Sequence, residues 1–186
     1  MKLFSKKKLH EDAIEISLSE FISVTGGVIA GIFLLDLLQN IDLLFGLLIL
    51  YPGLLEMNGN IYSSLAARLS NLLLLEKIKT KHDLKDFILK NIFAVFFLSL
   101  VVSLILGLIV YFFVYFVLHT NNLSLVYTAV LSSLFCTIIQ FPLTIYTTML
   151  VYKHKLDPEN IMGPDITTIS DIISVISIII AIKVLI

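Results

Sequence analysis

The stretch NIFAVFFLSLVVSLILGLIVYFFVYFVLHTNNLSLVYTAVLSSLFCTIIQFPLTIYTTMLVY, residues 91–152, contains no aspartate, glutamate, lysine or arginine. About 20 apolar residues suffice for one helix to cross the hydrocarbon core of a bilayer, and this run is far longer. The whole chain agrees, since 58% of its 186 residues are hydrophobic and 15% are charged, with a mean hydropathy of +1.00. Soluble domains are about 25% charged. The sequence therefore predicts an all-α integral membrane protein.

Charged and turn residues divide the chain into five apolar segments. We predict membrane helices at Ser19–Leu38, Leu43–Leu75, Leu84–Leu118, Leu123–Tyr152 and Gly163–Leu185. They form one membrane domain over residues 19–186, preceded by a short basic segment over residues 1–18. The second and third helices exceed one bilayer thickness, so we expect tilt, a break near Gly53–Gly59 or extension into the cytosol.

The basic residues lie almost entirely on one side of this five-helix arrangement. Of the 13 lysine and arginine residues, all but Lys183 fall in the N-terminal segment, in the Arg68–Lys90 region, or at Lys153 and Lys155. The positive-inside rule therefore places the N-terminus in the cytosol and the C-terminus outside. We expect a multi-pass protein of the cell membrane. The net charge of −1 indicates no bulk electrostatic attraction to nucleic acid or to anionic lipid.

The segment PGLLEMNGN, Pro52–Asn60, puts a proline, two glycines, a carboxylate and two amides inside the second apolar helix. Buried polar groups are unfavourable in lipid unless they are paired or line a cavity. Glu56 and Asn60 are one helical turn apart and share a face. Two interpretations stay open: Glu56 handles an ion, or it is a neutral or paired carboxyl, with Arg68 or a lysine as its partner. The whole segment would then be a structural kink.

The fifth segment carries an acidic residue that has no nearby basic partner in sequence. Gly163-Pro164 suits a helix start, and Thr167, Asp171 and Ser174 follow at a spacing that places them on one face. Asp171 lies ~12 Å inside that start, at 1.5 Å per residue. An ionisable residue inside a membrane indicates a functional site. The alternative is a hydrogen bond to another helix.

The candidate ligands suit a hard cation. Mg²⁺ demands oxygen ligands in octahedral geometry and gives up its water reluctantly. Asp171, Thr167, Asn60 and the backbone freed by Pro52 supply oxygen atoms of this kind. Cys136 stands alone, and the four histidines fall in or near the predicted termini and loops, which disfavours a zinc or copper site.

Two segments resemble a known family, the MgtE magnesium transporters. Pro52–Asn60 followed by LAARLS, Leu65–Ser70, resembles the second transmembrane helix of that family. The stretch from LDPEN, Leu156–Asn160, through GPDITTISD, Gly163–Asp171, is similar to its fifth helix. The animal solute-carrier relatives of MgtE have similar segments in duplicated form. The resemblance covers the chain as one five-helix unit.

The resemblance implies a homodimer with an ion pathway along its two-fold axis. The family's principal acidic pore residue falls on Asp171, and its Gly-Asn segment falls on Gly59 and Asn60. Many relatives have a second glycine where this chain has Asn58. Bacterial relatives also have a large cytosolic magnesium-sensing part, whereas a short segment precedes Ser19, so gating by such a part is not expected.

Transport of a divalent metal cation, with Mg²⁺ as the transported ion, is the function that these observations favour. The proposed metal-contacting residues are Asp171, Asn60, Thr167, Gly59 and Glu56. The alternative is a non-transporting membrane scaffold or subunit whose polar residues serve helix packing. A membrane enzyme is disfavoured, because the sequence has no histidine cluster, nucleophile motif or phosphate loop.

Overall fold

The computed structural model describes residues 13–14, 16–18, 20–21, 24–29, 31–32, 44–154 and 158–185. Four long helices make up most of this part: α2 at Leu44–Leu74, α3 at Lys81–Leu118, α4 at Ser124–Lys153 and α5 at Pro158–Leu185. The described residues between 13 and 32 are helical as well, and the described part of the chain contains no strand. The predicted all-α class is therefore confirmed.

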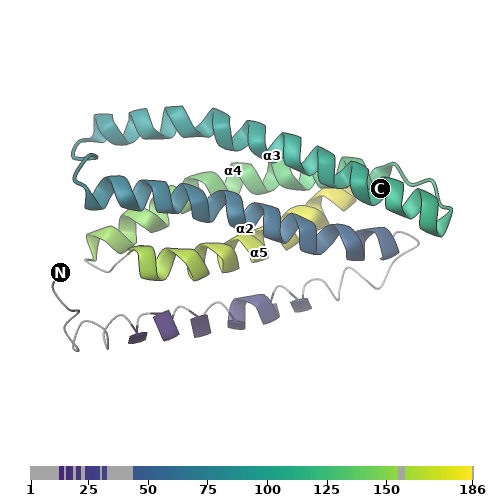
Figure 1. The fold of residues 1–186 in the computed structure, drawn as a ribbon, viewed down its shortest axis with the longest axis horizontal. Helices are drawn as coiled ribbons and strands as arrows, with labels where there is room; N and C mark the ends of the chain where they lie inside the picture. The colour runs from purple at the N-terminus through teal and green to yellow at the C-terminus, as the bar shows by residue number, and fades with distance from the viewer. Residues whose placement is uncertain are drawn as a thin grey trace, which may run out of the picture.

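The helices lie side by side along their length (Figure 1). Two of them are central, because α2 and α4 pack against each other and both pack against α3 and α5. The described pieces of the first segment run along the α5 side of the bundle (Figure 1). Gly26 makes the close approach there, since a Cβ at this position would lie 2.1 Å from Cγ2 of Thr168. At Gly27 and Gly31, a Cβ would meet no described atom within 4 Å.

Local sequence signals explain both ends of α3. Thr80 is the N-cap: its backbone N–H donates to the Asp83 carboxylate at 2.8 Å, and the Asp83 N–H donates to the Thr80 hydroxyl at 3.2 Å. This reciprocal pair is a capping box, which satisfies two otherwise unpaired donors. At the other end, the C-cap residue His119 adopts a left-handed conformation with φ 54°, which stops the helix.

Large apolar residues lie on the outside of the bundle, and some polar residues lie in its interior, which is unlike a soluble protein. The outer face of α3 exposes large apolar side chains, with Phe93 at 78% and Phe116 at 68% of their full accessibility. The interior buries apolar residues such as Leu50 and Leu65, but also amides and hydroxyls such as Gln140. A soluble monomer rarely exposes so large an apolar surface, whereas a lipid-facing helix is expected to do so.

The number of predicted membrane spans needs a correction. Among the described residues, three helices are long and apolar enough to cross a membrane: Lys81–Leu118, Ser124–Lys153 and Asp165–Leu185. Three of the five predicted spans are therefore confirmed by length and composition, and the other two are not. The apolar run of α2 is interrupted by Glu56 and its amide neighbours, which lower its hydropathy, and the predicted first span lies partly outside the described residues.

Two further predictions of helix geometry were wrong or incomplete. α2 continues from Leu44 to Leu74 through Pro52, so no break occurs near Gly53–Gly59. Pro52 lies inside this helix, and its side chain is exposed. The last helix begins at Pro158 rather than at Gly163, because a proline also suits the first helical position. The predicted outer loop at residues 39–42 lies outside the described residues.

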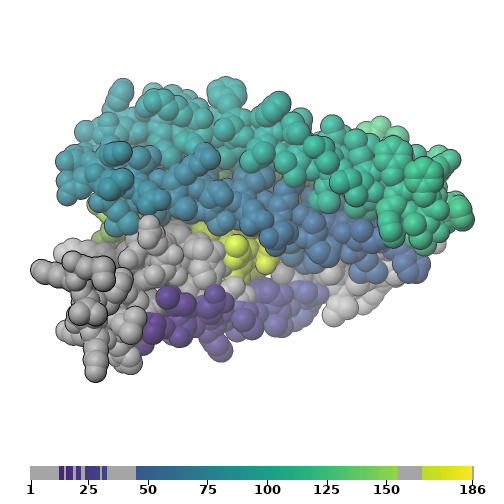
Figure 2. All heavy atoms as spheres, in the orientation of Figure 1, coloured from purple at the N-terminus to yellow at the C-terminus, as the bar shows by residue number. Residues whose placement is uncertain are grey.

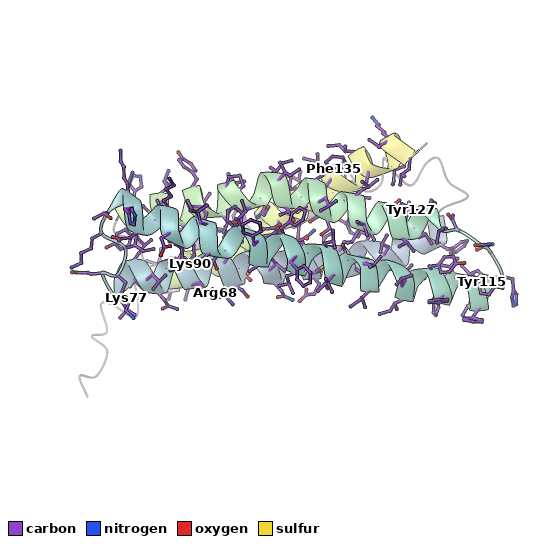
Figure 3. The ribbon with its side chains drawn as sticks, turned by 90° about the horizontal axis from the view of Figure 1, so that it is seen from above. Arg68, Lys77, Lys90, Tyr115, Tyr127 and Phe135 are labelled. Atoms are coloured by element: carbon purple, nitrogen blue, oxygen red, sulfur yellow. The ribbon has the colours of Figure 1, made fainter. Side chains whose placement is uncertain are left out.

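The basic residues of α2 and α3 gather toward one end of the bundle. Arg68, Lys77 and Lys90 lie there, whereas Tyr115 and Tyr127 lie toward the opposite end (Figure 3). Lysine and arginine are typical of the cytosolic end of a membrane bundle, and tyrosine of the membrane interfaces. This distribution agrees with the charge pattern of the sequence.

Candidate functional site

The predicted ion-contacting residues lie on α2 and α5, which pack against each other. Gly59 is buried, and a Cβ built on it would lie 3.5 Å from Cγ2 of Thr167, an ordinary van der Waals distance. The two residues therefore face each other across the seam between the helices. Figure 2 shows α5 reaching the surface between α2 and the pieces of the first segment.

Glu56 and Asn60 are linked by a hydrogen bond on α2. The Asn60 amide nitrogen, Nδ2, donates to the Glu56 carboxylate oxygen Oε1 at 2.9 Å. Both side chains are exposed on the single subunit. This bond holds one carboxylate oxygen of Glu56 in place. The other carboxylate oxygen of Glu56 and the side-chain carbonyl of Asn60 do not take part in it, and both can accept a bond from a ligand.

Asp171 on α5 completes an acidic pair with Glu56. The two carboxylates lie close enough to interact electrostatically, and Tyr51 on α2 also lies within the field of Asp171. The Asp171 side chain is half-buried. Each of the two helices that pack together at this seam therefore contributes one carboxylate.

The resulting site offers only oxygen atoms. Glu56 and Asp171 provide carboxylates, Asn60 provides an amide carbonyl and Thr167 a hydroxyl. Hard divalent cations prefer such ligands. A cation would also relieve the repulsion between the two carboxylates, which is strong where water is scarce. These ligand types are the ones that a hard divalent cation prefers.

The polar residues predicted to share one face of α5, Thr167, Asp171 and Ser174, are not equally buried. Ser174 is buried, and its hydroxyl oxygen accepts a hydrogen bond from Asn58 Nδ2 at 2.8 Å. The sulfur of Cys136 lies 3.6 Å from the same oxygen. Ser174 thus joins α2, α4 and α5 inside the subunit, whereas Asp171 lies nearer the surface. Asn58 takes part in this interior packing.

Arg68 does not pair with Glu56. It lies twelve residues further along α2, and its guanidinium donates to the Asn91 side-chain oxygen of α3 at the limiting distance of 3.5 Å. The local partner of Glu56 is Asn60 instead. The alternative in which Arg68 neutralises Glu56 is therefore wrong, since a helix places residues twelve positions apart ~18 Å from each other.

The sequence analysis missed the buried polar residues of α4. Five of them, together with the buried Cys136, recur at every fourth position: Thr128, Ser132, Cys136, Gln140, Thr144 and Thr148. Nearby, the Tyr62 hydroxyl of α2 donates to the Thr137 hydroxyl at 2.9 Å. The four-residue spacing was the signal, because each member of the series lies next to the following one on the helix surface. Small residues of this kind let membrane helices approach closely.

Comparison with known families agrees with the order and spacing of these segments. Residues 51–181 match the model of the MgtE family, described as divalent cation transporter. The match includes every residue placed above on the α2–α5 seam. No curated protein and no solved structure matched the chain. Because the family model covers well over half of the chain and both halves of the acidic site, this protein belongs to the MgtE family of divalent cation transporters.

Proposed function

We propose that this protein transports Mg²⁺ across the cell membrane, and that Asp171 is the main residue attracting the ion. The supporting observation is the acidic pair of Asp171 and Glu56 on the seam between α2 and α5, in a chain whose family transports divalent cations. The ligands are all hard oxygen atoms, which favours Mg²⁺ over soft metals. Asn60, Thr167 and the backbone at Gly59 complete the shell, largely through the ion's own water.

The functional unit in this proposal is a homodimer. Glu56 and Asn60 are exposed on a single subunit, and a carboxylate facing lipid in the middle of a helix is unfavourable. A second copy related by a two-fold axis would cover this face with the same surface. It would also bring two copies of Asp171 toward one pathway, as the resemblance to the family implies.

The proposed topology keeps five spans. α2 and the first segment lie alongside the three apolar helices in the bundle (Figure 1), so we infer that they cross the membrane with them. Lys77 and Lys90 then mark the cytosolic end.

The deciding experiment is Mg²⁺ uptake into proteoliposomes by the Asp171→Asn variant. The amide keeps the shape of the side chain but removes one charge per subunit, so we expect transport to fall by at least tenfold. Competition by Co²⁺ and Mn²⁺ on the unmodified protein measures selectivity for Mg²⁺. The matched control is Asp86→Asn, which removes an exposed carboxylate near the basic end and should transport at the normal rate.

A mass measurement in detergent accompanies this test. We expect two chains per particle for the unmodified protein and for both variants, which shows that any loss of transport is not a loss of assembly. A transport-competent monomer would contradict the homodimer. If Asp171→Asn transports at the unmodified rate, Asp171 is structural and Glu56 becomes the next candidate.

The alternative function is a membrane scaffold that moves no ion. The buried bond between Asn58 and Ser174 favours it in one respect, because it shows polar residues serving helix packing. The same liposomes distinguish the two functions, since a scaffold would give no Mg²⁺ flux above that of empty vesicles even without substitution.

A further inference from the structure

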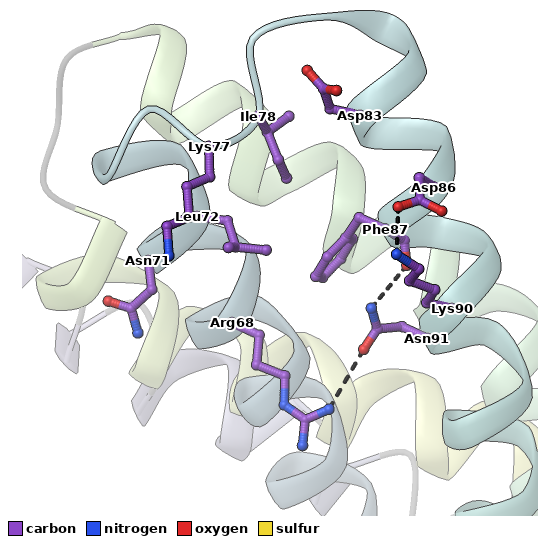
Figure 4. Close-up of a pocket in the computed structure, with 10 residues that line it drawn as sticks. All are labelled: Arg68, Asn71, Leu72, Lys77, Ile78, Asp83, Asp86, Phe87, Lys90 and Asn91. Atoms are coloured by element: carbon purple, nitrogen blue, oxygen red, sulfur yellow. Dashed lines mark hydrogen bonds and ion pairs between the residues drawn. The ribbon is translucent and has the colours of Figure 1, made fainter.

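A continuous groove runs along the outside of α2 and α3. Its wider part is a cavity of about 560 Å³ near the basic end, and its narrower part is a cavity of about 320 Å³ that reaches Asn60. Arg68 and Asn91 line both cavities, so the two parts meet at this pair. Figure 4 shows Arg68 extending from α2 toward Asn91 on α3.

The lining of the wide part has three basic and two acidic side chains, a formal net charge of +1. Arg68, Lys77 and Lys90 line it together with Asp83 and Asp86. Both carboxylates are already engaged: Asp86 pairs with Lys90 at 2.6 Å, and Asp83 accepts the capping bonds at the start of α3. Among the described residues, no carboxylate forms an ion pair with Arg68 or Lys77. This end therefore favours an anion.

The narrow part is mainly apolar. Ile61 and Leu65 of α2 line one wall, and Ala94, Val95 and Leu98 of α3 line the other. A hydrocarbon chain would fit such a surface, whereas a hydrated ion would not. The guanidinium at the junction also repels a metal cation, so this groove is poorly suited as a cation entrance.

The charge pattern of α3 places the junction at the membrane surface. On α3, Asn91 begins the run of residues without charge, directly after Lys90. The charged cavity thus lies at the depth of lipid headgroups, and the apolar part extends toward the middle of the bilayer.

We propose that this groove binds one anionic phospholipid of the cytosolic leaflet. The lipid phosphate contacts Arg68 and Lys77, and one acyl chain lies between α2 and α3 against Leu65, Ala94 and Val95. Arginine recognises phosphate oxygens through paired N–H donors. The apolar continuation of the groove favours a lipid over a free phosphate compound, because a free anion would use only the wide part.

Native mass spectrometry of the full chain in detergent tests this proposal. The probes are phosphatidylglycerol and phosphatidylcholine with the same acyl chains, and inorganic phosphate serves as a competitor. We expect preferential retention of phosphatidylglycerol, and roughly fivefold weaker binding for Arg68→Gln, as the loss of one positive charge near the surface predicts. Ala94→Leu, which narrows the apolar part without changing charge, should weaken binding of both lipids.

The matched control is Lys85→Gln, which removes an exposed positive charge from the same end of α3 outside the groove. This variant should bind phosphatidylglycerol normally. Equal retention of the two lipids by the unmodified protein would overturn the proposal, and so would an Arg68→Gln variant that binds as tightly as Lys85→Gln. Displacement by inorganic phosphate with no effect of Ala94→Leu would identify a free-anion site instead and would also reject the lipid.

Discussion

Asp171 and Glu56 show how single residues define the candidate site. Each carboxylate comes from a different helix, and their mutual repulsion in a region of low dielectric constant is unfavourable without a counter-ion. Asn60 orients Glu56 through a 2.9 Å hydrogen bond, and no described basic residue forms an ion pair with Asp171. In the proposed pore, the arriving divalent cation supplies the missing positive charge.

Ser174 and Ser177 allow a matched test of a buried polar contact. Both are buried on α5, but Ser174 accepts a bond from Asn58, whereas the Ser177 hydroxyl has no described hydrogen-bond partner. Ser174→Ala leaves the Asn58 amide without a partner, so we expect a loss of about 1–2 kcal/mol in unfolding free energy. Ser177→Ala should cost much less. Denaturant titration in detergent measures both values.

The same pair of variants separates packing from transport. Because Ser174 lies inside the subunit, Ser174→Ala should retain most of its Mg²⁺ uptake despite the lower stability. Equal stability of the two alanine variants would show that the bond to Asn58 contributes nothing. A transport defect in Ser174→Ala as large as that of Asp171→Asn would place Ser174 in the ion pathway.

At the scale of helices, α3 and α4 approach each other closely at Gly107. A Cβ at this position would lie 3.0 Å from the backbone Cα of Val126 and 3.0 Å from Cβ of Ala129. Backbone atoms cannot rotate away, so an added methyl group must push the helices apart. At Gly59, by contrast, the nearest atom is Cγ2 of Thr167 at an ordinary distance.

We therefore predict opposite effects for two glycine-to-alanine changes. Gly107→Ala should lower the free energy of unfolding by about 1–3 kcal/mol, the usual range for overpacking. Gly59→Ala should be neutral or slightly stabilising, because alanine is the better helix former by about 1 kcal/mol. Thermal unfolding of both variants in detergent gives the comparison. Destabilisation by Gly59→Ala as large as that by Gly107→Ala would show that the α2–α5 seam is tighter than described.

The helix boundaries show which structural features can be predicted from neighbouring residues in the sequence. The predicted second helix, Leu43–Leu75, ends one residue later than α2, Leu44–Leu74, because charged and polar residues follow the apolar run, and Leu43 lies outside the described residues. The start of α5 was predicted too late, since Pro158 and Pro164 both suit a first turn. Whether Pro52 breaks α2 depends on packing around it, which a local pattern does not contain.

At the scale of the whole molecule, an apolar exterior surrounds a partly polar interior. Between helices in a membrane, close packing and hydrogen bonds replace the hydrophobic driving force of water. The bonds of Tyr62 with Thr137 and of Asn58 with Ser174 connect α2 to α4 and α5 in this way. This arrangement requires lipid around the outer face of α3.

Orientation in the membrane can be tested with introduced cysteines. Native Cys136 is buried and is first replaced by alanine. In intact cells, an impermeant thiol reagent should label Asn121→Cys in the loop after α3, but should not label His82→Cys at the basic end, because lysine and arginine favour the cytosolic side. Both positions are exposed and should react after the cells are opened. Labelling of His82→Cys from outside would reverse the topology.

Composition and the spacing of charges determined the class of this protein and its approximate helices, whereas the family was indicated by the motifs at Pro52–Ser70 and Leu156–Asp171 and shown by the family match. These properties depend on runs of neighbouring residues, because apolar length and local charge act along one helix. The helical period also placed Glu56 and Asn60 on one face. Only the tertiary structure decided that Asn58 bonds to Ser174 and that Glu56 lies near Asp171. A periodic pattern shows which residues share one face of a helix. Which face of a neighbouring helix they contact depends on how the whole helices pack together.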